Sequence, residues 1–133
     1  MKKIEHIGIA VKDLQASNAL FEKLFGAPAY KEESVESEGV KTSFFMNGPN
    51  KIELLEATNP DSPIAKFLEK KGEGIHHIAF DVEDIEAEMK RLSDEGFIVL
   101  NEKPKKGADN KLVAFLHPKT TNGVLIELCQ EIK

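Results

Sequence analysis

The fold is decided by residues 75–82, which read Ile-His-His-Ile-Ala-Phe-Asp-Val. Apolar and polar side chains alternate there, which predicts a β-strand with one apolar face and one polar face. His77 lies on the polar face beside the small side chain of Ala79, so its imidazole ring has open space in front of it. The apolar face consists of Ile78, Phe80 and Val82.

The same pattern occurs earlier, in residues 4–11, which read Ile-Glu-His-Ile-Gly-Ile-Ala-Val. His6 takes the place of His77, and the second copy follows the first by 71 positions. The chain is therefore predicted to contain two copies of one module, each beginning with a strand that presents a histidine. We expect the apolar faces of both strands to contact helices. In the first copy that face consists of Ile7, Ile9 and Val11.

Local signals predict how each copy continues. Asp13 predicts the N-cap of a helix over 14–25, which Gly26 ends. Asp84, again 71 positions later, predicts the cap of a second helix. Between the copies, Ser62 followed by a proline predicts the start of a short helix. The expected strands after the first helix and in the second copy include 40–46, 51–57, 97–100, 111–116 and 124–129, with a loop over 101–110.

These elements predict an α+β fold, with residues 1–133 forming one domain. Two tandem βαβββ modules are expected to form a curved mixed sheet around a metal site, with the helices on its outer face. Module one covers about 1–57, a connector covers 58–74, and module two covers about 75–133.

The composition excludes several classes of protein. The net charge of −5 and the pI near 5.4 argue against a general binder of nucleic acid or of anionic membranes. Cys129 is the only cysteine, so an internal disulfide is impossible and a reducing compartment is favoured. No apolar run is long enough to span a membrane, and no signal-peptide core is evident. We therefore expect a cytoplasmic location.

A glutamate interrupts an aliphatic strand in each copy. Ile-Glu-Leu-Leu at 52–55 matches Ile-Glu-Leu-Cys at 126–129. A buried carboxylate without a partner is costly, and a divalent cation would remove that cost. Two imidazoles and two carboxylates carry a net charge of −2 and suit Mn, Fe, Co, Ni or Zn. Taken singly, each of these residues more often has a satisfied structural role, but their shared position in the repeat favours a common role as ligands. The predicted ligand set is His6, Glu53, His77 and Glu127.

Four further features have alternative interpretations. His76 points away from His77 and is the alternative ligand. His117 precedes a proline and is interpreted as a strand-end residue. Cys129 is interpreted as a small buried or cleft-lining residue, because no activating partner is evident. A basic cluster is either a solvated loop or a contact for phosphate groups; it comprises Lys103, Lys105 and Lys106.

The chain resembles the vicinal oxygen chelate (glyoxalase/bleomycin resistance/dioxygenase) superfamily, and within it the methylmalonyl-CoA epimerases. The resemblance implies one divalent ion on the four ligands above, with Co²⁺ favoured and Zn²⁺, Mn²⁺ or Ni²⁺ as alternatives. Some members have Gln at the position of Glu53, so the site here carries one more negative charge. The resemblance also implies a CoA-thioester substrate and a homodimer. It rests on residues 4–11, 51–56, 61–65, 74–80, 115–119 and 123–128.

The implied reaction interconverts (2R)- and (2S)-methylmalonyl-CoA by removal of the α-proton through a metal-stabilised enolate. Glu127 is the favoured base by resemblance. A second base of some members aligns with Thr42, which has no carboxylate. Either another acid serves in its place, with Glu33, Glu36 and Glu38 nearby in the sequence and none of them selected, or one face uses a water or a different residue. The alternatives are a glyoxalase I-type lactoylglutathione lyase and a metal-free resistance-type binding module. A dioxygenase fits less well, because its iron usually has one carboxylate ligand.

Overall fold

The computed structural model describes residues Met1–Lys133 and divides into two compact units. The N-terminal unit is His6–His76, and the C-terminal unit combines Met1–Glu5 with His77–Lys133. None of the helices has the length and hydrophobicity that a membrane span requires. The helices are α1 (Leu14–Phe25), α2 (Pro63–Lys71) and α3 (Ile85–Asp94). The strands are β1 (Lys3–Ala10), β2 (Lys31–Val35), β3 (Val40–Asn47), β4 (Asn50–Ala57), β5 (Gly74–Asp81), β6 (Lys105–Lys106), β7 (Lys111–Leu116) and β8 (Ile126–Glu131).

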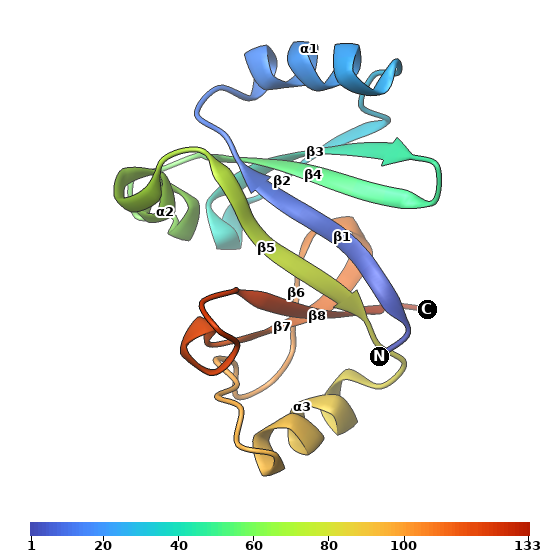
Figure 1. Cartoon of the computed structure of the whole chain (residues 1–133), viewed down its shortest axis with the longest axis vertical. Coiled ribbons are helices and arrows are strands. Elements are labelled where there is room, and N and C mark those ends of the chain that lie inside the picture. The colour runs from blue at the N-terminus through green and yellow to red at the C-terminus, as the bar shows by residue number, and fades with distance from the viewer. The chain divides into compact units, whose positions relative to one another are not determined.

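The N-terminal unit has the strand order β2-β3-β4-β1 (Figure 1). β1 and β4 are parallel, as expected for strands joined by a long connection, and the hairpin pairs are antiparallel. The Asp13 carboxylate caps α1 by accepting a hydrogen bond from Ala16 N at 3.1 Å, and Gly26 ends the helix with a φ of 77°. One face of the sheet packs against α1 through Val11, Leu14, Phe45 and Leu54.

The C-terminal unit repeats this plan with the order β5-β8-β7-β6. Asp84 caps α3 by accepting from Ala87 N at 3.1 Å. Ile85, Met89 and Leu92 of α3 pack against the strands together with Val82. The predicted βαβββ module is therefore confirmed in both copies.

The predicted faces of the two leading strands are also confirmed where they meet helices. Ile9 and Val11 pack in the α1 cluster, and Val82 packs in the α3 cluster. Ile7, Ile78 and Phe80 are half-buried. His6 and His77 point away from those helices and are 5% exposed.

The predicted strand over 97–100 is wrong. Only Val99 forms a bridge there, to Leu116. The side chain of Asn101 explains why the ladder stops, because its Oδ1 accepts the hydrogen bond from Phe115 N at 2.8 Å. A side-chain oxygen thus replaces the carbonyl of a paired strand. The second strand of the module is instead β6, inside the predicted loop, and it pairs with β7.

Candidate functional site

The N-terminal unit buries one predicted histidine and carboxylate together. The parallel register of β1 and β4 places His6 beside Lys51 and Gly8 beside Glu53. Because Gly8 has no side chain, the Glu53 carboxylate can turn toward His6, and Oε2 lies 3.2 Å from His6 Nδ1. Both side chains are about 5% exposed. Two of the four predicted ligands, His6 and Glu53, thus lie in contact on one sheet face.

The C-terminal unit holds the equivalent pair. Ala79 on β5 lies opposite Glu127 on β8, and the small alanine leaves room for the carboxylate. His77 Nε2 lies 3.0 Å from Glu127 Oε1. The rings of His77 and Phe115 pack in a T-shaped arrangement, with their centroids 6.1 Å apart. Each unit thus presents one imidazole nitrogen and one carboxylate oxygen in contact.

Sequence reasoning missed Lys51. Its side chain is only 4% exposed, although lysine is almost never fully buried without a partner. Nζ lies 3.5 Å from Glu53 Oε2 and 5.6 Å from the centroid of the Phe44 ring. The signal was the alternation of β4, which puts Lys51, Glu53 and Leu55 on one face. The N-terminal pair is therefore a triad of imidazole, carboxylate and ammonium.

Thr42 is a buried polar residue on this same face. In the antiparallel register of β3 and β4, Thr42 lies opposite Leu55. This pair is two positions along the ladder from the pair of Phe44 and Glu53. It is completely buried, and its Oγ1 has no hydrogen-bond partner. Buried hydroxyls are normally bonded, so an unpaired one beside a candidate site indicates a place for a ligand or its water.

The remaining histidines have structural roles. His76 packs edge-on against Phe67 of α2, with ring centroids 4.9 Å apart. His117 Nδ1 accepts a hydrogen bond from Lys119 N at 3.0 Å and caps a 3₁₀ turn. The interpretation of His117 as a strand-end residue is confirmed.

Cys129 lies on the Glu127 face but is chemically protected. It is fully buried, with Sγ 3.5 Å from the Phe80 carbonyl oxygen. Burial raises the pKa of the Cys129 thiol well above its ordinary value, and the nearby Glu127 carboxylate raises this pKa further. The thiol therefore stays protonated at neutral pH, and its interpretation as a small buried residue is confirmed.

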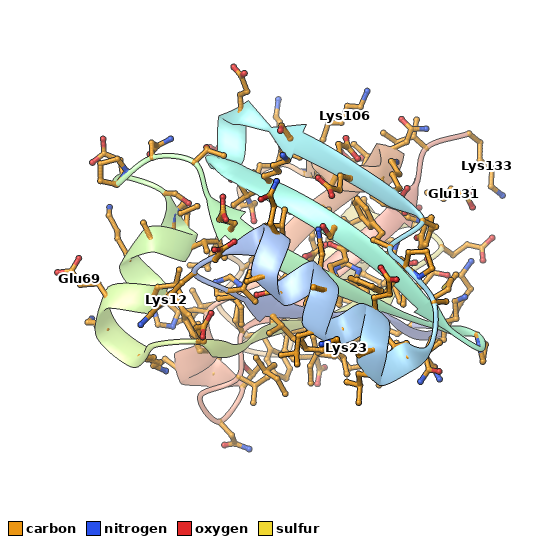
Figure 2. All side chains as sticks on the ribbon, turned by 90° about the horizontal axis from the view of Figure 1, so that it is seen from above. Lys12, Lys23, Glu69, Lys106, Glu131 and Lys133 are labelled. Atoms are coloured by element: carbon orange, nitrogen blue, oxygen red, sulfur yellow. The ribbon has the colours of Figure 1, made fainter.

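The pairing of β6 with β7 places Lys105 and Lys106 of the basic cluster on opposite faces of the sheet. Lys105 lies opposite Val113, which packs with Ala79 and Cys129 on the Glu127 face. Lys106 lies opposite Leu112, which packs against the α3 cluster on the other face. Figure 2 shows Lys106 projecting outward from the ribbon. Lys103 lies in the segment before β6, and all three lysines are exposed.

Comparisons with known proteins agree with this geometry. The family described as the Glyoxalase/Bleomycin resistance protein/Dioxygenase superfamily matches residues 5–115. An ethylmalonyl-CoA/methylmalonyl-CoA epimerase of Cereibacter sphaeroides is 47% identical over 96% of this chain and 97% of its own. The human mitochondrial methylmalonyl-CoA epimerase is 40% identical over 96% of this chain and 73% of its own. A Streptomyces coelicolor methylmalonyl-CoA epimerase variant in complex with 2-nitronate-propionyl-CoA has a TM-score of 0.95 at 36% identity, covering 100% of this chain and 99% of that one.

Proposed function

The chain belongs to the methylmalonyl-CoA epimerase family of the glyoxalase/bleomycin resistance/dioxygenase superfamily, and we propose that it interconverts (2R)- and (2S)-methylmalonyl-CoA. One observation carries this proposal. Each unit buries a histidine in contact with a carboxylate, at matching strands of the two modules. A chain that only had a structural role would gain nothing from burying two such pairs, because buried charges are costly.

The chemistry is the transfer of a proton next to a thioester carbonyl. A base must take this proton while the negative charge that moves onto the carbonyl oxygen is stabilised. We assign the base to Glu127, whose side chain is only 8% exposed and contacts His77. Epimerisation then requires a proton to return to the opposite face of the same carbon.

The donor set fits a divalent cation. We propose that the two pairs ligate one ion together, since two imidazoles and two carboxylates balance its charge and suit Co²⁺, Zn²⁺, Mn²⁺ or Ni²⁺. Co²⁺ is favoured from the family resemblance. When bound, the ion would supply Lewis-acid stabilisation of the thioester oxygen. The unpaired Thr42 hydroxyl on the same face supports a ligand site. The proposed ligands are His6, Glu53, His77 and Glu127.

The test of the function starts from one pure epimer of methylmalonyl-CoA. Metal-loaded protein should convert it to a mixture of both epimers, as followed by an enzyme that consumes only one of them. The matched control is the glutathione hemithioacetal of methylglyoxal, which a glyoxalase-type enzyme would isomerise. Turnover of the hemithioacetal without epimerisation of the CoA thioester would contradict the proposal.

The two faces of β6 allow a sharp test of CoA binding. We propose that Lys105, with Lys103, contributes to phosphate contact, since Lys105 shares the Glu127 face and Lys106 does not. Lys105→Gln should raise KM about fivefold at low salt and leave kcat unchanged, because a remote contact holds substrate and transition state equally. The effect should shrink at high salt.

Lys106→Gln is the control for this prediction, and its KM should match that of the wild type. Equal KM values for the two variants would assign the basic cluster to a solvated loop.

We also propose that the chain forms the homodimer expected from the family resemblance. Sedimentation at micromolar concentration should give twice the chain mass of 14.8 kDa.

A further inference from the structure

Epimerisation requires two proton-transfer groups, one for each face of the carbon, and Glu127 provides only one. Thr42 occupies the position on β3 where the sequence resemblance places a second carboxylate. Its hydroxyl is fully buried and unpaired on the Glu53 face. A threonine hydroxyl is too weak a base to remove an α-proton at neutral pH. A carboxylate on a neighbouring strand that shares the Thr42 face could take this role.

The register of the neighbouring strand selects a candidate. Glu33 on β2 lies directly opposite Thr42 in the antiparallel pairing of β2 and β3. Side chains of directly opposite residues share one sheet face, so Glu33 lies on the face of Thr42 and Glu53. Its carboxylate is 32% exposed, and Oε1 lies 3.4 Å from Lys31 Nζ. Glu33 is thus a half-buried carboxylate oriented by a cation.

The other acidic residues of this segment are placed elsewhere. Glu32 lies on the opposite face, where it accepts a hydrogen bond from Asn18 Nδ2 of α1 at 3.1 Å and lies 3.5 Å from Lys41 Nζ. Glu36 and Glu38 belong to a 3₁₀ turn outside the ladder. The structure therefore distinguishes Glu33 from Glu36 and Glu38, which the sequence left equivalent.

We propose that Glu33 is the second proton-transfer residue, an inference that rests on the epimerase function proposed above. Two strand spacings separate β2 from β4, about 10 Å, which leaves room for an acyl group between Glu33 and Glu53. In one direction the C2–H bond breaks, its proton moves to a Glu33 carboxylate oxygen, and the electron pair moves toward the thioester carbonyl. Protonated Glu127 then donates to C2 on the other face. In the reverse direction the two carboxylates exchange roles.

The test uses each epimer of methylmalonyl-CoA separately in D₂O with metal-loaded Glu33→Gln protein. Interconversion should fall at least about 100-fold, the usual contribution of a general acid or base. One epimer should still exchange its C2 proton for deuterium with retention of configuration, since Glu127 still serves that face. The divalent metal content should equal that of the wild type. Glu32→Gln, the adjacent acid on the other face, should interconvert the epimers within twofold of the wild-type rate.

Two outcomes would overturn the role of Glu33. Interconversion by Glu33→Gln within threefold of the wild-type rate would exclude it as a proton carrier. Loss of exchange from both epimers together with loss of metal would assign it to assembly of the site instead.

If the wild type itself interconverts no epimers, the proposed function fails and the Glu33 role fails with it. If the wild type is active and Glu33→Gln is equally active, only the Glu33 role fails.

Discussion

His77→Ala is expected to leave the purified protein with far less than one divalent ion per chain after dialysis, whereas the wild type keeps one. The imidazole of His77 contacts Glu127 at 3.0 Å, so its removal deletes one proposed ligand and releases a second from its orientation. Loss of groups that only support metal ligands costs about 10- to 100-fold in affinity, and loss of a ligand should cost more than about 100-fold. Elemental analysis measures the metal content per chain, and titration with Co²⁺ measures the metal affinity.

His76→Ala is the matched control, since the two histidines are adjacent in the sequence. His76 packs against Phe67 of α2, so its removal should lower the melting temperature slightly and spare metal binding. Stoichiometric metal in the His77 variant, or equal loss in both variants, would show that the site is misassigned.

Lys51→Met is expected to destabilise the metal-free protein strongly. The Glu53 carboxylate is buried, and the Lys51 ammonium lies 3.5 Å from it. Removing one partner of a buried ion pair costs about 3–5 kcal/mol, because the other charge stays buried. For a chain of this size the melting temperature should fall by at least about 10 °C. Calorimetry of chelator-treated protein provides the measurement.

A divalent cation should restore most of the stability that Lys51→Met loses, because it supplies the positive charge that Glu53 then lacks. The metal-induced rise in melting temperature should therefore be larger for this variant than for the wild type. A double variant, Lys51→Met with Glu53→Gln, should recover stability without metal, since no charge remains to be compensated. Lys41→Met, which removes an exposed lysine near Glu32, should have little effect. An unchanged melting temperature for metal-free Lys51→Met would contradict the role of this pair.

The Lys51 ammonium also bears on the charge of the site. The sequence indicated one more negative charge than in relatives that have Gln at the position of Glu53. In the structure, the buried ammonium of Lys51 balances that charge in the N-terminal unit. Alternation along β4 places Lys51 on the Glu53 face but does not indicate that its side chain is buried, because a lysine at the start of a strand normally extends into water.

Much of the fold follows from local sequence signals. Asp13 and Asp84 cap their helices as predicted, since the capping contact involves only nearby residues. Alternation along the strands placed His6 and His77 on the faces away from the helices, because a strand has a strict period of two. The contact of each histidine with a carboxylate depends in addition on the pairing of distant strands.

The features that the sequence did not predict depend on contacts between distant residues. The strand expected over 97–100 is absent because Asn101 bonds to Phe115 on β7. The selection of Glu33 depends on the register of β2 against β3, which is set by the turn between them. That turn ends at Gly39, whose φ of 63° favours glycine. An added Cβ there would come within about 3 Å of Asn59 and Ser62, so both side chains would have to shift. Alternation along a single strand does not contain this information.

The epimerase assignment is tested most directly by deuterium wash-in at C2 of methylmalonyl-CoA in D₂O. Metal-loaded wild-type protein should introduce one deuterium at C2 far faster than the protein-free control, as measured by mass spectrometry. Removal of the metal with a chelator should abolish this exchange. Exchange no faster than in the protein-free control, with fully metal-loaded protein, would contradict α-proton transfer as the function of this chain.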